Sequence, residues 1–406
     1  MLKTPLLNTF VQILGKLAMV GISLLTTGLL TRGLGIKTYG NFILITSLMI
    51  FFDTLSDFGG KIIGVREASV QTSEKEKIKV WVNMALVRLV VAVISFGLGL
   101  IFIFNWSDLA QVRIAAVVAF VMILFTSIAG SLEMVWQTRQ KMGEKVIVET
   151  LFPIIFLIGF YYLGSSLGLI GVFGLYLVAR IVTLGMGIVR LRGFFDFSLV
   201  NKDLMIKMFR LSIPMGLYLL LFTAYDRAID ATMISRFLGK SEVAMYGLSY
   251  KIYGSLLSPA YYLMNSIFPT LSSNVKGKKV LFGKALLIMV AASIGIVVLI
   301  QFLAPVIVDV LGGSEFAGAV PVLRLLILAV FFSYLGHLMG FGLISKNGQK
   351  EMVFLGVVVL MFNFAANLWA IPRFGMMGAA GVTVLSEAMA MILMGLFLWM
   401  KTKYNF

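Results

Sequence analysis

The sequence lacks cysteine altogether and contains a single histidine, His337. Without cysteine the chain has no disulfide framework, no thiolate nucleophile and no cysteine-ligated metal. His337 lies in an apolar stretch with no second imidazole to share a metal, so we interpret it as a packed polar residue. These absences exclude enzymes that depend on a thiol or on a metal bound by cysteine and histidine, and we expect neither a metal nor another cofactor.

Charged residues are also scarce. They make up 13% of the chain against 60% hydrophobic residues, and the mean hydropathy is +1.00. Soluble domains are about a quarter charged. The apolar runs have the length of membrane-spanning helices rather than the alternating pattern of an outer-membrane barrel. The sequence therefore predicts an all-α polytopic membrane protein. Its twelve spans are expected at roughly 9–31, 41–60, 80–104, 114–136, 146–163, 170–189, 209–234, 243–271, 285–308, 320–343, 352–371 and 376–400.

The formal net charge of +16 would suggest nucleic-acid binding in a soluble protein. The location of the charge argues otherwise. About 22 of the 34 Lys and Arg residues fall in the termini and the loops that share their side of the membrane, and about 6 fall in the opposite loops. This bias predicts that both termini are cytoplasmic. We expect no nucleic-acid partner.

Glycine motifs occur twice in the chain. The repeated pieces are Thr31–Gly35 with Ser235–Gly239, Tyr39-Gly40 with Tyr246-Gly247, and Gly168-x-x-Gly171 with Gly375-x-x-Gly378. The last two pairs share an offset of 207 residues, which indicates a duplicated unit. Six spans per unit predict parallel repeats. We expect an N-lobe over 1–200, whose cytoplasmic connector starts at about 190, a C-lobe over 201–406, and a cleft between them.

Charged residues also occur within the predicted spans. An ionised group at the bilayer centre costs about 2.5–3.5 kcal/mol on insertion scales, so deep charges should face protein or a wet cavity. The basic ones are Lys16, Arg88, Arg180, Arg227, Lys251 and Arg324, and the acidic ones are Asp53, Asp57, Glu133, Asp226, Asp230 and Glu387. Arg324 is near enough to a span end to snorkel. Internal ion pairs that only hold helices together remain an open alternative for each residue.

Several motifs together resemble a known family across the whole chain in order. They are Arg32-Gly33-Leu34-Gly35-x-x-x-Tyr39-Gly40, Asp57-Phe58-Gly59, Arg66-Glu67, Asp230 through Tyr246, Phe268-Pro269-x-Leu271-Ser272, and Asn363-x-x-x-Asn367 continuing to Ala380. This set is similar to the polysaccharide-biosynthesis flippases of the multidrug/oligosaccharidyl-lipid/polysaccharide exporter (MOP) superfamily.

The resemblance implies a V-shaped, two-lobed transporter in the bacterial cytoplasmic (inner) membrane. It implies that the chain carries an undecaprenyl-pyrophosphate-linked oligosaccharide from the cytoplasmic to the outer leaflet by alternating access. The product would serve the assembly of O-antigen, capsule or exopolysaccharide. Besides this substrate and membrane lipid, a polysaccharide polymerase and a chain-length regulator are candidate partners. We expect no enzymatic activity.

The resemblance implies that basic residues lining the central cavity bind the pyrophosphate and sugar. The inner ones would be Lys16, Arg88 and Arg180, and the outer ones Arg227 and Lys251. The alternative is a drug or cation exporter of the same superfamily, in which acids hold a cationic drug or a coupling proton. Those acids would be Asp53, Asp226, Asp230 and Glu387. Embedded bases favour the flippase, because they would repel a cation. A non-transporting scaffold would need no charge within the membrane.

Overall fold

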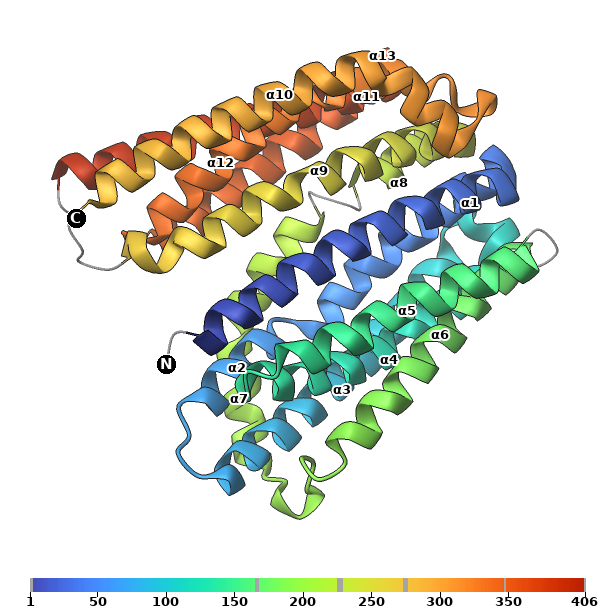
Figure 1. Ribbon diagram of the computed structural model, residues 1–406. Helices are drawn as coiled ribbons and strands as arrows, with labels where there is room; N and C mark the ends of the chain where they lie inside the picture. The colour runs from blue at the N-terminus through green and yellow to red at the C-terminus, as the bar shows by residue number, and fades with distance from the viewer. Residues whose placement is uncertain (1–2, 165–167, 225–228, 273–276, 347, 405–406) are drawn as a thin grey trace. The chain divides into compact units, whose positions relative to one another are not determined.

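The computed structural model describes residues 3–164, 168–224, 229–272, 277–346 and 348–404. It describes no side chains for residues 3–18, 222, 265–266, 269–270, 272, 278–279, 349 and 404. All the regular secondary structure in the described ranges is helical (Figure 1). The chain forms two compact units, Met1–Leu34 with Leu44–Ala228, and Gly35–Ile43 with Ile229–Phe406.

The first unit contains most of α1 (Lys3–Asp57), α2 (Gly60–Ser69), α3 (Glu74–Asn105), α4 (Arg113–Thr138), α5 (Met142–Leu163), α6 (Gly168–Leu191) and α7 (Lys202–Thr223). The second contains α8 (Ile229–Phe237), α9 (Lys240–Ser272), α10 (Lys278–Gly312), α11 (Ala319–Leu326), α12 (Leu328–Ile344) and α13 (Gln349–Tyr404). Short 3-10 turns occur at Ser107–Val112, Phe197–Leu199 and Ser314–Phe316.

Nine helical stretches in the described residues are long and apolar enough to cross a membrane. Two of them, Met19–Ser69 and Lys350–Lys403, hold two spans each, because their helices break at Gly35 and Gly375. The twelfth span is α9, which is 33 residues long but less apolar. At about 1.5 Å per residue it exceeds the hydrocarbon thickness. The prediction of a twelve-span, all-α membrane protein is confirmed.

The repeated glycines stand where the chain reverses. Gly35 has a φ of 70° and Gly239, between α8 and α9, has a φ of 127°. The second glycine pair behaves alike, since φ is 56° at Gly168 and 60° at Gly375. A residue with a Cβ is strained in this region, whereas glycine enters it freely. Both copies therefore use the same device to end one span and begin the next.

The glycines of the two Tyr-Gly pairs both lie at close contacts inside the second unit. A Cβ placed on Gly40 would overlap the carbonyl oxygen of Lys240, and one placed on Gly247 would lie 2.7 Å from the Ile43 side chain. Small residues let helix backbones approach this closely in membrane proteins. The segment Gly35–Ile43 is thus packed directly against the start of α9, and the Tyr-Gly motif serves that contact.

The first unit is built around α3 and α4, which pack on each other, while α6 packs on α4 and α5 (Figure 1). Its core includes Trp81 and Met84 of α3 with Met134 and Trp136 of α4. The large apolar side chains left exposed, such as Val189 at 68%, match a surface in contact with lipid.

The link between α6 and α7 is fixed to α3 by one buried amide. The Asn83 side chain accepts the backbone N–H of Asn201 at 2.7 Å and donates to the Leu199 carbonyl at 3.0 Å. Asn201 in turn caps α7 by accepting the Leu204 N–H. As a result α7 packs against α2 and α3 in the first unit, although the expected boundary near residue 200 assigns it to the C-lobe.

Replacing Gly40 by alanine tests the close contact in the second unit. We expect Gly40→Ala to destabilise the protein by about 1–3 kcal/mol, because the added methyl must displace backbone. The measurement is the melting temperature of the detergent-purified protein. Gly295→Ala is the matched control, since a Cβ there meets nothing within 4 Å. Equal melting temperatures for the two variants would contradict the contact.

Candidate functional site

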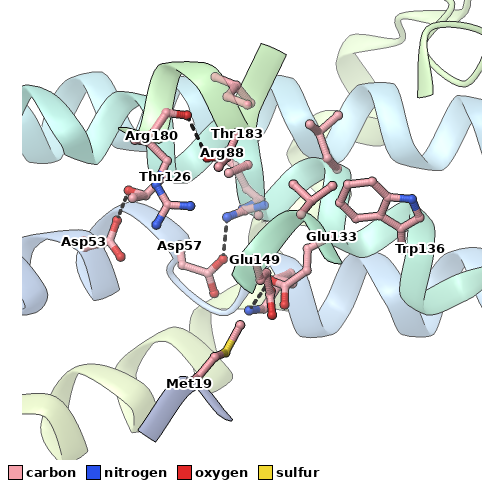
Figure 2. Close-up of a pocket in the computed structure, with 16 residues that line it drawn as sticks. Met19, Asp53, Asp57, Arg88, Thr126, Glu133, Trp136, Glu149, Arg180 and Thr183 are labelled. Carbon is pink, nitrogen blue, oxygen red and sulfur yellow. Dashed lines mark hydrogen bonds and ion pairs between the residues drawn. The ribbon is translucent and has the colours of Figure 1, made fainter. Parts of the chain in front are cut away.

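A polar cavity of about 430 Å³ lies within the first unit (Figure 2). This is within the size range of small-ligand pockets. Side chains from α1 to α6 line it. Its charged lining residues are Asp53, Asp57, Lys61, Arg88, Glu133, Glu149 and Arg180. A cavity of this polarity among apolar helices is the strongest candidate site in the described part of the chain.

One wall of the cavity depends on the break between α1 and α2. The backbone leaves the helix at Phe58 and Gly59, whose φ values are 40° and 74°. A Cβ on Gly59 would lie 2.9 Å from the backbone nitrogen of Gly216 in α7, so the break is held by close packing. Asp53 and Asp57 stand one helical turn apart before the break, and Lys61 follows it. All three side chains therefore reach the same space.

Arg88 of α3 is held in a buried ion pair. Its Nη2 lies 2.9 Å from Oδ1 of Asp57, and its Nη1 donates to the Ser131 hydroxyl at 3.1 Å. Only 3% of Arg88 is exposed. Gly60 and Gly130 leave the room that its side chain fills. Arg88 therefore lines the cavity with its charge already compensated.

A second group of charges, the Glu133 cluster, consists of Lys61, Glu133, Lys145 and Glu149. Lys61 Nζ lies 2.8 Å from Oε2 of Glu133. Lys145 also pairs with Glu133 and lies 3.7 Å from Glu149. The cluster connects α2, α4 and α5, so its charges too are compensated within the protein.

Arg180 has a different environment. Its guanidinium lies 4.3 Å from the centroid of the Phe152 ring. Its Nε is buried with no hydrogen-bond partner in the structure, as is the Nε of Arg88. Among the described residues no carboxylate is within ion-pair distance of it. Figure 2 shows its side chain directed from α6 toward Asp53. Asp53 accepts a hydrogen bond from the Thr126 hydroxyl and likewise has no ion-pair partner among the described side chains.

Asp230 occupies a separate buried cluster in the second unit. It accepts hydrogen bonds from the Tyr246 hydroxyl, from Asn367 Nδ2 at 2.8 Å and from the Thr383 hydroxyl at 3.4 Å. Asn367 also donates to Asn363. The cluster joins α8, α9 and α13. All three of these donors to the carboxylate are neutral groups.

The remaining predicted site residues lie outside this cavity or outside the described part of the chain. Glu387 accepts a hydrogen bond from Ser333 at 2.7 Å, and Lys251 is partly buried on α9. The Lys16 side chain lies outside the described part of the chain, as do Asp226 and Arg227. The structure thus brings Asp53, Arg88 and Arg180 to one cavity, and their predicted roles there stay predictions.

Sequence reasoning missed three charges of the cavity region, namely Lys61, Lys145 and Glu149. Lys61 and Lys145 were assigned to loops because the apolar runs end beside them, yet α2 begins at Gly60 and α5 at Met142. Glu149 lay in a predicted span without being counted. The four-residue spacing of Lys145 and Glu149 is typical of an ion pair on a helix and could have indicated the extension of α5.

His337 lies within α12, where its Nδ1 is 2.7 Å from the Ser333 carbonyl oxygen and its ring meets Tyr261 edge-on. This local bonding agrees with the interpretation of His337 as a packed polar residue. In the described ranges no three His, Asp or Glu side chains are grouped as metal ligands.

Residues 6–275 match the model of the family described as "Polysaccharide biosynthesis protein". No curated protein matches the chain. Among solved structures, lipid II flippase MurJ in an inward closed conformation is 15% identical, with a TM-score of 0.75, over 98% of this chain and 87% of that one. An inward-facing multidrug resistance MATE family transporter of the MOP superfamily is 16% identical, with a TM-score of 0.73, over 97% and 98%. The MATE multidrug transporter DinF-BH is 16% identical, with a TM-score of 0.70, over 100% and 96%. The expected fold class is therefore confirmed.

Removing Arg88 alone should be strongly destabilising. Arg88→Met leaves Asp57 buried and uncompensated, which costs about 3–5 kcal/mol for pairs of this kind. We expect Asp57→Asn in the same chain to restore most of the loss. Melting temperatures of both single variants and the double variant measure the coupling. Arg66→Met, at the exposed Arg66–Glu67 pair, is the control and should change little. Additive effects of Arg88→Met and Asp57→Asn would argue against the pair.

Proposed function

Because this chain belongs to the family of polysaccharide biosynthesis proteins, we propose that it is a flippase for an undecaprenyl-pyrophosphate-linked oligosaccharide. It moves this substrate from the cytoplasmic to the outer leaflet of the bacterial cytoplasmic membrane by alternating access. Both of its termini are cytoplasmic. It transports rather than catalyses, and it supplies surface polysaccharide assembly, with a polymerase and a chain-length regulator as partners.

The observation that carries this proposal is the unpaired guanidinium of Arg180 in the cavity of the first unit. A guanidinium presents a planar set of donors that matches phosphate oxygens, and its hydrogen bonds to an anion are charge-assisted. In the described part of the cavity, Arg88 and Lys61 are already bound to Asp57 and Glu133. A pyrophosphate can therefore reach Arg180 without first breaking an ion pair.

The fold neighbours support two kinds of cargo. One is a lipid II flippase and others are multidrug transporters. The family match favours the glycan, and an exporter of drugs or cations is the second candidate. The observation that favours the second is Asp53, a cavity carboxylate that is held by the neutral hydroxyl of Thr126.

Loss of the free guanidinium tests the flippase. In a bacterium that depends on this chain for surface polysaccharide, we expect Arg180→Ala to lower delivery at least about tenfold with unchanged protein level, since one charge-assisted contact is worth more than about 1.4 kcal/mol. Arg180→Lys should retain part of the activity. Arg190→Ala, an exposed position on the same helix, is the control.

The remaining predicted bases extend this test. Lys16→Ala, Arg88→Ala, Arg227→Ala and Lys251→Ala are scored in the same strain, with protein level in the membrane measured alongside. Normal polysaccharide in all five alanine variants would show that phosphate binding by embedded bases is wrong. Export of a cationic dye by the wild-type chain, without glycan delivery, would favour the exporter instead.

Asp230 is proposed as the coupling group of the second unit. Asp230→Asn keeps the shape of the side chain and removes its charge. We expect transport by this variant to lose its dependence on a proton or sodium gradient, because the carboxylate that binds the coupling ion is gone. The measurement is transport before and after each gradient is collapsed with an ionophore. Asp203→Asn, exposed at the start of α7, should keep the wild-type dependence. A gradient-dependent Asp230→Asn variant would contradict this role.

A further inference from the structure

Among the side chains that the structure describes, the acids and bases of the cavity region are equal in number, and all of them except Arg180 and Asp53 form ion pairs. Arg88 is bound to Asp57, and the Glu133 cluster contains two bases and two acids. The charges left over are Arg180 and Asp53, one of each sign. Both line the cavity, and neither forms an ion pair with any side chain that the structure describes.

Asp53 and Arg180 nevertheless line the same cavity, and the Arg180 side chain is directed toward Asp53 (Figure 2). The Thr126 hydroxyl holds the Asp53 carboxylate by a hydrogen bond from α4. The guanidinium rests on the Phe152 ring of α5. The two opposite charges thus share one cavity, and each is held by a different neighbour without forming an ion pair.

We propose that Asp53 is the resident counter-ion of Arg180, and that an anionic ligand takes its place on the guanidinium during binding. The identity of the anion as the pyrophosphate of a lipid-linked glycan rests on the proposed function. The Asp53 charge compensates Arg180 while the cavity is empty and repels the anion once it is bound. Repulsion weakens binding and speeds release. Thr126 is a positioning residue, because it keeps Asp53 from occupying Arg180 permanently.

This arrangement predicts opposite effects from two neighbouring substitutions. Asp53→Asn removes the repulsion, so the protein should bind inorganic pyrophosphate roughly tenfold more tightly, the effect of one unit charge about 10 Å away at an effective dielectric constant of about 20. Thr126→Val frees Asp53 to close on Arg180 and should weaken binding. In the double variant the Thr126 effect should vanish, because the carboxylate on which it acts is gone.

The experiment is titration of the purified full-length chain in lipid nanodiscs with pyrophosphate. Arg180→Ala should abolish saturable binding. Asp203→Asn carries the same change in net charge as Asp53→Asn but lies outside the cavity, so it should bind like the wild type. Asp53→Ser removes the charge in case the asparagine variant does not fold. Weaker or unchanged binding by the Asp53 variants, or no saturable binding by the wild type, would overturn the proposal.

Surface polysaccharide measured in parallel separates this proposal from the flippase itself. We expect Asp53→Asn to deliver less glycan than the wild type while binding pyrophosphate more tightly, because release is slowed. If the affinities follow the prediction but the wild type delivers no glycan, the counter-ion exchange stands and the flippase assignment fails. If the wild type delivers glycan but Asp53→Asn does not tighten binding, the flippase stands and the exchange is wrong.

Discussion

A charge buried among apolar helices has to be compensated, and the first unit is arranged around that requirement. Helices in lipid gain little from burying apolar surface against each other, because the lipid is equally apolar. Polar contacts therefore contribute more to fixing the positions of the helices. The Arg88–Asp57 pair joins α3 to the end of α1, and the Glu133 cluster joins α2, α4 and α5. The same contacts that hold the helices also define which charges a ligand can meet.

The repeated glycine motifs form the backbone turns of both units, whereas the buried charges differ between the units. Glycines with positive φ end spans in both copies, at Gly35 and Gly239 and again at Gly168 and Gly375. The buried polar groups follow no such repeat. Acids and bases are paired around the cavity of the first unit, whereas in the second unit Asp230 accepts hydrogen bonds from Tyr246, Asn367 and Thr383. The same glycine turns therefore accompany different sets of buried polar groups.

The spans and the glycine turns could be predicted from sequence because both depend on local properties, namely apolar run length and the φ that only glycine adopts easily. The positions of Arg88 and Arg180 within long apolar helices followed from the same counting. The sequence did not predict that Arg88 forms an ion pair while Arg180 forms none, because pairing depends on the rotation of each helix and on which neighbour it meets. Lys61 was not predicted as a cavity residue for a related reason, because the apolar run ends at residue 60 while the helical structure continues in α2. The packing of α7 on α2 and α3 depends on Asn83, a single buried amide that no periodicity indicates.

The pairing of charges in the cavity bears on which cargo the cavity can bind. The sequence sets six bases against six acids within the spans, and repulsion of a cation by those bases favours a flippase. In the structure that repulsion is reduced, because a base that is bound to a carboxylate repels a cation only weakly at a distance. The preference of the cavity for one sign of ligand then depends on which of its charges already form ion pairs and which do not. Arg180 has no carboxylate partner among the described side chains, whereas Asp53 accepts a hydrogen bond from Thr126. Preference for an anion can therefore arise where the described acids and bases of a cavity are equal in number, because only some of the charges are already paired.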